Sequence, residues 1–144
     1  MSGTRSGRLP AGLELHPWYG LLTLTYVVGI YWLSSRPDLD PRQSDLWIQL
    51  AANLLHVPLY GGLTFCLLQA ISGGRAGEEP SRDLSALALL ATASYAALDE
   101  WHQSFVPGRS ASVGDLFLDF VGIAGMLLVV RLSARNGRIG PGST

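Results

Sequence analysis

Four apolar runs, joined by short polar connections, constrain the fold of this chain more than any other feature. The runs begin at Trp18, Leu46, Leu84 and Val113, and the last of them ends at Leu132. A helix needs about 20 mostly apolar residues to cross a hydrocarbon core of about 30 Å, and each run meets this length, the third only marginally. The helices of a soluble bundle would need polar outer faces, which these runs lack. The sequence therefore predicts an all-α integral membrane bundle of four transmembrane helices, a single domain over residues 17–132.

The composition agrees with a membrane protein and excludes several functional classes. Hydrophobic residues make up 48% of the 144 residues and charged residues only 15%, whereas an average soluble chain has roughly 25% charged residues. The net charge of −1 offers no basic surface for nucleic acid. For a membrane protein we expect membrane lipids as partners, and oligomerisation is left open. The single cysteine, Cys66, excludes a disulfide framework and a zinc finger. We expect no cofactor.

The arginines set the expected orientation, because the chain has no lysine. With four spans, seven arginines lie in the N-terminal arm, the second connection and the tail, and three lie in the other two connections. The positive-inside rule then predicts a multi-pass protein with both termini in the cytoplasm. Residues 1–16 and 133–144 are expected to be a mobile arm and a mobile tail. The polar stretch DEWHQSFVPGRSASVGD, residues 99–115, would face outward.

The second run carries polar residues at helical spacing. Asn53, His56 and Tyr60 fall at i, i+3 and i+7, which places them on one helix face. Pro58 lies among them and frees the carbonyl of Leu54 from its helical hydrogen bond. Two interpretations remain open for this face: a histidine that holds helices together, or the wall of a polar cavity.

The third run repeats this spacing at its end. Tyr95, Asp99 and His102 share one face, with Glu100 and Gln103 beside them. A helix end that reaches the membrane surface would explain Glu100 well. It explains Asp99 less well, because apolar residues surround that position.

The fourth run begins with an S-x-x-D pattern, Ser112 and Asp115, which is typical of a helix N-cap. Asp119 lies one turn deeper, and no cap accounts for it. An acid inside a span is costly and usually faces a cavity or a bundle interior, so we interpret Asp119 as functional. The small residues Gly61, Gly62, Gly122 and Gly125 are expected to let the helices approach closely.

Three motifs together resemble the VanZ-like family of small membrane proteins. They are IYWLSSRP (30–37) with the family's paired serines, LLHVPLYGGL (54–63) with its H-x-x-x-Y span, and YAALDEWHQSFVPGRSASVGDLFLDFVGIAGMLL (95–128). The last is the most specific and follows the pattern D-E-x-H-Q-x-F-x-P-G-R-x-x-x-x-x-D. Asp119 stands where many relatives have Asn, and Ala111 where Gly is frequent. The family's polar positions correspond here to His56, Tyr60, Asp99, Glu100, His102, Gln103, Arg109 and Asp115.

The resemblance implies a role in the cell envelope, with the chain in the bacterial cytoplasmic membrane. The family takes its name from a protein associated with resistance to glycopeptide antibiotics, notably teicoplanin. The resemblance implies no particular reaction.

Two functional hypotheses follow. In the first, an outward-facing polar pocket binds an anionic lipid headgroup, a lipid-linked wall precursor or a lipoglycopeptide, with Arg109 contacting a phosphate or carboxylate. The expected ligand-binding residues are His56, Tyr60, Gln103, Arg109, Asp115 and Asp119. In the second, the chain is an intramembrane hydrolase or transferase acting on a lipid-linked envelope substrate. Its catalytic residues would be Asp99, Glu100 and His102, with His102 as the general acid or base.

Three further possibilities have weaker support. A metal site could use His56 and His102 with nearby acids, but no spacing in the chain is specific to metal. Ser110 or Ser112 could act as a nucleophile, although Ser112 already has a capping role. His56 and Asp119 could form a proton relay.

Overall fold

The protein is all-helical in the part of the chain that the computed structural model describes, residues 12–37, 45–109 and 111–138. The four helices are α1 (Pro17–Ser34), α2 (Leu46–Ile71), α3 (Arg82–Gln103) and α4 (Val113–Arg138). Four helices were predicted at these places, and the bounds of α2 are those of the second apolar run. α4 continues beyond Leu132, the expected end of the domain. Of the arm and tail expected to be mobile, residues 1–11 and 139–144 lie outside the described residues.

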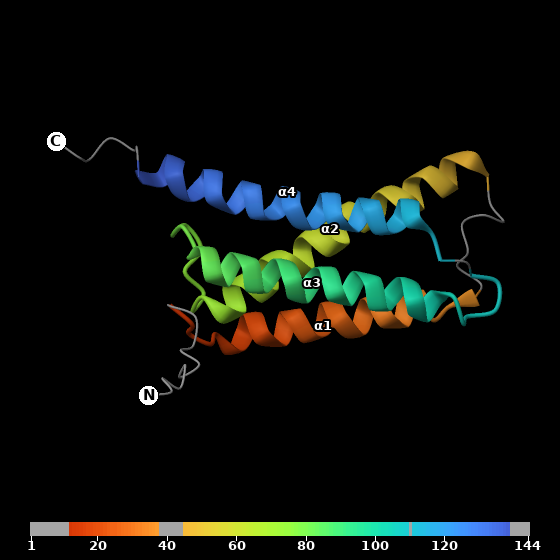
Figure 1. Ribbon diagram of the computed structural model, residues 1–144, viewed down its shortest axis with the longest axis horizontal. Helices are drawn as coiled ribbons and strands as arrows, with labels where there is room; N and C mark the ends of the chain where they lie inside the picture. Colours follow the sequence, from red (N-terminus) through yellow and green to blue (C-terminus); the bar gives the residue numbers. More distant parts are fainter. Residues whose placement is uncertain (1–11, 38–44, 110, 139–144) are drawn as a thin grey trace, which may run out of the picture.

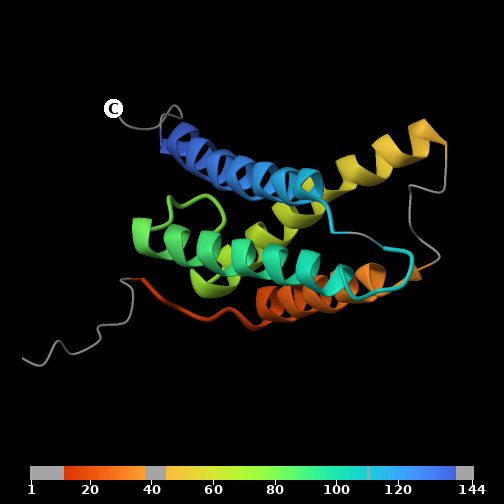
Figure 2. The same cartoon turned by 45° about the vertical axis from the view of Figure 1, so that its right-hand side comes forward.

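The helices run alternately in opposite directions (Figures 1 and 2). α1 and α3 lie side by side and point the same way, whereas α2 and α4 run in the opposite direction. We call the end that holds the α3–α4 connection the distal end. The other end, which holds the start of α1, the α2–α3 connection and the end of α4, is the proximal end.

Local sequence signals explain where the helices begin and bend. Pro17 stands at the first position of α1, where a missing N–H costs nothing. Ser81 caps α3, its side chain accepting a hydrogen bond from the Leu84 N–H at 3.2 Å. Pro58 lies inside α2, and α2 bends near its middle, so that its first half diverges from α1 and α3 (Figure 1).

Residues 12–16 pack against the end of α2. The Glu14 N–H donates to the Ile71 carbonyl at 3.0 Å and the His16 N–H to the Ala70 carbonyl at 2.8 Å. The Gly73 N–H in turn donates to the Glu14 carbonyl at 2.8 Å. The last carbonyls of a helix have no partner within the helix, and this segment satisfies two of them in α2. This part of the expected N-terminal arm therefore contacts the bundle.

The apolar and polar residues are distributed in the opposite way to a soluble bundle. Large apolar side chains are exposed on all four helices, among them Leu24, Trp47, Leu90 and Phe117. The interior holds a hydrophobic cluster that includes Tyr60, Leu63 and Ile123, together with polar residues such as Thr64, Thr92 and Asp119. Such an outer surface suits hydrocarbon better than water.

Within the part of the chain that the structure describes, two helices are long and apolar enough to cross a membrane. These are residues 50–71 of α2, with a mean hydropathy of 1.5, and residues 113–136 of α4, with a mean hydropathy of 2.1. α1 and α3 do not reach the same criterion, because α1 is rich in aromatic residues and α3 begins and ends with charged ones.

Glycines bring α2 and α4 together, as the sequence predicted for Gly61 and Gly122. A Cβ at Gly122 would overlap the Val57 carbonyl, and one at Gly61 would lie 3.3 Å from the Gly122 carbonyl oxygen. Gly62 faces the Tyr26 ring of α1. The same expectation was wrong for Gly125, which faces open space on the outer side of α4.

Candidate functional site

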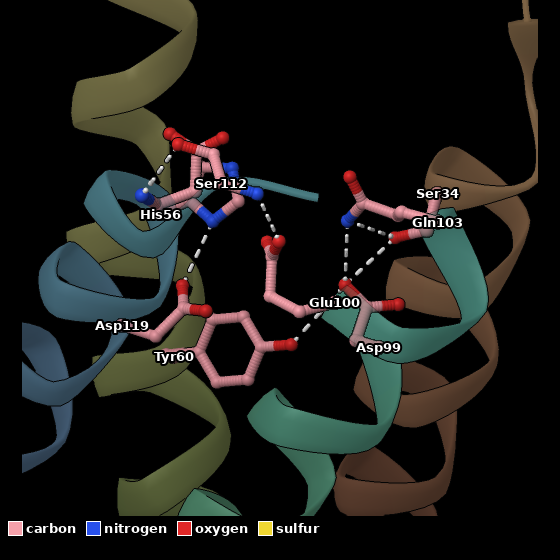
Figure 3. Close-up of polar contacts among 9 residues, drawn as sticks. Ser34, His56, Tyr60, Asp99, Glu100, Gln103, Ser112 and Asp119 are labelled. Atoms are coloured by element: carbon pink, nitrogen blue, oxygen red, sulfur yellow. Dashed lines mark hydrogen bonds and ion pairs between the residues drawn. The ribbon is translucent and has the colours of Figure 1, made fainter. Parts of the chain in front are cut away.

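One set of polar side chains lies close together near the distal end of the bundle (Figure 3). α1 contributes its last residue, α2 the residues around its bend, α3 its last turns and α4 its first turns. We call this set the distal polar cluster; its members are Ser34, His56, Tyr60, Asp99, Glu100, Gln103, Ser112 and Asp119.

Asp99 accepts hydrogen bonds from side chains of three helices. Its Oδ2 atom receives hydrogen bonds from Ser34 Oγ at 2.9 Å, Gln103 Nε2 at 3.1 Å and Tyr60 Oη at 3.3 Å. The carboxyl group is 5% exposed. A carboxylate that accepts several hydrogen bonds is stabilised away from water. Asp99 therefore holds α1, α2 and α3 together at this level.

His56 and Asp119 form a second pair, between α2 and α4. His56 Nδ1 lies 2.8 Å from Asp119 Oδ1, and Asp119 is 1% exposed whereas the His56 side chain is 23% exposed. The Tyr60 ring stacks near the His56 ring, with centroids 6.4 Å apart and planes 8° apart. Tyr60 thus lies between this pair and Asp99, as Figure 3 shows.

Glu100 holds the start of α4. Its Oε2 atom accepts a hydrogen bond from the Ser112 N–H at 2.7 Å, and Ser112 Oγ accepts one from the Asp115 N–H at 3.4 Å. The capping role predicted for Ser112 is confirmed. The reciprocal bond of a capping box comes from Glu100 of the preceding helix rather than from Asp115, which is only partly buried.

His102 faces α1 and not the two acids beside it in the sequence. His102 Nε2 lies 2.9 Å from Ser35 Oγ, and the His102 ring packs on Tyr31 with centroids 4.8 Å apart. Asp99 and Glu100 bond to Ser34 and Ser112 instead. The three residues expected to act together in catalysis are therefore directed to different partners.

Arg109 binds the end of α1. Its Nε atom donates to the Arg36 carbonyl at 3.1 Å and its Nη2 atom to the Leu33 carbonyl at 2.9 Å. The Leu33 carbonyl also accepts the Arg36 N–H at 3.2 Å, so Arg109 adds a side-chain donor to the end of α1. The Arg109 guanidinium group thus binds the backbone of the two residues that flank Ser34 and Ser35 in the sequence.

Two buried oxygens of the cluster lack partners among the described residues: Glu100 Oε1 and Asp119 Oδ2. Buried carboxyl oxygens without partners are costly, and such costs are usually associated with function. No three His, Cys, Asp or Glu side chains come together as a metal site in the described part of the chain. His56 and His102, which a metal site would have shared, bond to residues of different helices.

Ser34 and Ser35 were not among the site residues that the sequence analysis selected. The signal was present in the motif IYWLSSRP, but adjacent serines at the end of a helix indicate no particular chemistry until their partners are known. The structure supplies these partners, Asp99 and His102, from a helix more than 60 residues away in the chain.

The chain also matches a known protein family. A model of the VanZ/LLP1 family matches residues 4–134, nearly the whole chain. The protein belongs to this family. No curated protein and no solved structure matches the chain. The VanZ-like assignment and the two apolar helices together identify a VanZ-like membrane protein.

In this VanZ-like chain, the arrangement offers two kinds of chemistry at the distal end. Histidines paired with a carboxylate or a hydroxyl can accept or donate a proton. Arginines at the rim can bind an anionic group through parallel hydrogen bonds. The buried acids themselves are largely occupied in holding the helices together.

Proposed function

We propose that all four helices cross the bacterial cytoplasmic membrane, with both termini in the cytoplasm and the distal end facing outward. The exposed apolar side chains on α1 and α3 support spans for these two helices as well. α1 carries exposed tryptophans at both ends, Trp18 and Trp32, and tryptophan favours the two membrane surfaces. The two tryptophans stand 14 positions apart, about 21 Å along the helix. The 18 residues of α1 correspond to about 27 Å, which covers most of a hydrocarbon core of about 30 Å.

The distal end of this protein binds the headgroup of an anionic lipid or of a lipid-linked wall precursor. The observation that carries the proposal is the separation of charges there: Arg36 is exposed and Arg109 partly exposed at the rim, whereas Asp99, Glu100 and Asp119 are buried beneath them. The Arg36 guanidinium lies over the Trp32 ring, 4.2 Å from its centroid. An approaching phosphate therefore meets these two guanidinium groups before it meets the three buried carboxylates.

Native mass spectrometry of the protein extracted from its own membrane tests this proposal. The wild type should retain an anionic lipid, and Arg36→Gln should lose it, because the exposed Arg36 side chain contacts only the Trp32 ring among the interactions described here. Arg131→Gln, at the proximal end of α4, is the matched control and should retain the lipid. Equal retention by both variants, or an empty wild type, would contradict the proposal.

A role in glycopeptide susceptibility follows if the bound headgroup belongs to a lipid-linked wall precursor. Producing the protein in a teicoplanin-susceptible bacterium should then change the inhibitory concentration of teicoplanin, and Arg36→Gln should abolish the change. An unchanged inhibitory concentration would exclude this physiological role while leaving lipid binding intact.

A further inference from the structure

We infer that Ser35 is a nucleophile activated by His102, and that the distal end transfers acyl groups from ester-bearing lipids. Ser35 Oγ and His102 Nε2 are 2.9 Å apart, within the range of a nucleophile and its general base. Both residues are partly exposed, so a substrate can reach them. Neither the serine nor an acyl transfer is part of lipid binding as proposed above, although the choice of substrate rests on that proposal.

The neighbouring serine shows why the pair is distinctive. Ser34 is 6% exposed and donates to Asp99, so its hydroxyl is fixed within the bundle. Ser35 follows the last residue of α1 and lies at the membrane surface if α1 spans the membrane. Its Oγ is also 2.7 Å from the Tyr31 carbonyl. The hydroxyl proton therefore has two acceptors within reach, and rotation about the C–O bond directs it to His102 when Nε2 carries no proton.

Arg109 supplies positive charge at the same place. It binds the carbonyls of Leu33 and Arg36, the residues that flank the two serines. Its remaining nitrogen, Nη1, has no hydrogen bond among the described interactions. A guanidinium group beside the nucleophile stabilises the negative charge that develops on a carbonyl oxygen during acyl transfer.

The position of the pair favours an acyl ester over a phosphate ester as the substrate. The carbonyl of a lipid ester is neutral, so it approaches Ser35 without repulsion from the buried acids of the cluster. With its phosphate at Arg36, a glycerolipid would carry its ester groups deeper, towards the helix end where Ser35 lies. The Tyr31 and Trp32 rings are exposed there to contact the chains.

In the proposed acyl transfer, the proton that Ser35 loses is the one that the leaving alcohol gains. Ser35 Oγ attacks the ester carbon as its proton passes to His102 Nε2, and the carbonyl electrons move to oxygen. The intermediate collapses, the bond to the alcohol oxygen breaks, and His102 returns the proton to the leaving alcohol. Water or a second alcohol then takes the acyl group from Ser35 by the reverse of these steps.

Labelling with a long-chain alkyl fluorophosphonate tests the inference on the full chain in detergent. This reagent mimics a lipid ester and reacts with activated serines. We expect the label on Ser35, as located by peptide mass spectrometry, and we expect His102→Gln to slow labelling by about 100-fold, the usual contribution of a general base. Ser104→Ala is the control: Ser104 is an exposed serine of the same end whose hydroxyl donates to the Trp101 carbonyl, and its loss should leave the rate unchanged.

An unlabelled Ser35, or a labelling rate that does not depend on His102, would overturn the inference. To separate loss of the base from loss of structure, the melting temperature of His102→Gln is measured beside that of wild type. Ser35→Cys provides a second variant, since an activated position should react rapidly with an alkylating reagent only while His102 is present. The reagent carries no phosphate ester of a lipid headgroup, so failure of lipid binding and failure of the nucleophile give different results.

Discussion

The hydroxyl of Ser34 lies 2.9 Å from Asp99 Oδ2, which joins the end of α1 to the last turns of α3 across 65 positions of sequence. Tyr60 of α2 reaches the same oxygen atom. One carboxylate therefore fixes three of the four helices at the level where the histidines and arginines gather.

Replacing Asp99 tests this central role. Asp99→Ala leaves three buried donors without their acceptor, so we expect the free energy of unfolding in mixed micelles to fall by about 3 kcal/mol. Asp83→Ala, which removes an exposed acid from the first turn of the same helix, should cost less than about 1 kcal/mol. Similar losses for the two variants would contradict the proposed role of Asp99.

The two glycines of α4 offer a matched pair. Gly122→Ala places a Cβ against the Val57 carbonyl, and we expect a loss of about 1–3 kcal/mol in the free energy of unfolding, because α4 must move away from α2. Gly125→Ala meets no atom and should raise stability by up to about 1 kcal/mol through helix propensity. Chemical denaturation of both variants in the same detergent measures the two free energies of unfolding. If Gly122→Ala were the more stable variant, α4 would not contact α2 at Gly122.

His56 and Asp119 are expected to be energetically coupled. Because Asp119 is almost fully buried, His56→Ala leaves its carboxyl group with no hydrogen-bond partner, and the double variant His56→Ala/Asp119→Ala should cost less than the sum of the single variants. We expect a coupling free energy of about 1–3 kcal/mol from the double-mutant cycle. Additive losses would show that the pair contributes no interaction energy.

The proposed orientation predicts which ends of the bundle face outward. In a Cys66→Ala background, Ser104→Cys should react with a membrane-impermeant maleimide added to spheroplasts, because Ser104 is exposed at the distal end. Glu78→Cys, in the exposed α2–α3 connection, should react only after the membrane is permeabilised. The reversed pattern would place the termini outside the cytoplasm.

The sequence predicted where the helices lie and at which end of the bundle the polar side chains gather. It predicted less well which polar side chains bond to each other. Helical spacing placed Tyr95, Asp99 and His102 on one face of α3, and in the structure all three contact α1, through Val27, Ser34 and Ser35. Spacing also placed His56 and Tyr60 on one face of α2. It did not show that they serve different acids, because the partner of each depends on how α4 and α3 pack against the bend at Pro58.

Contacts between side chains and the backbone at the helix ends account for the other differences between the sequence predictions and the structure. Arg109 and Glu100 were interpreted as groups available to a ligand or a reaction, but each binds backbone atoms of another segment: the end of α1 and the start of α4. Backbone donors and acceptors carry no signal in the sequence, so these contacts could not be anticipated from residue types. Asp115 shows the same limit, since the capping bond expected from it comes from Glu100.

The pairing of Glu14 with Ile71 and Gly73 has a consequence for how the protein is made. The two segments it joins are present as soon as the ribosome has synthesised α2, so the proximal end of the first hairpin can close at that stage. The partners of Ser34 and Ser35 at the distal end, Asp99, Gln103 and His102, are translated a full helix later. The contacts of Glu14 at the proximal end can therefore form before α3 is made. The contacts of the two serines at the distal end can form only after α3 is made, so the distal polar cluster assembles later.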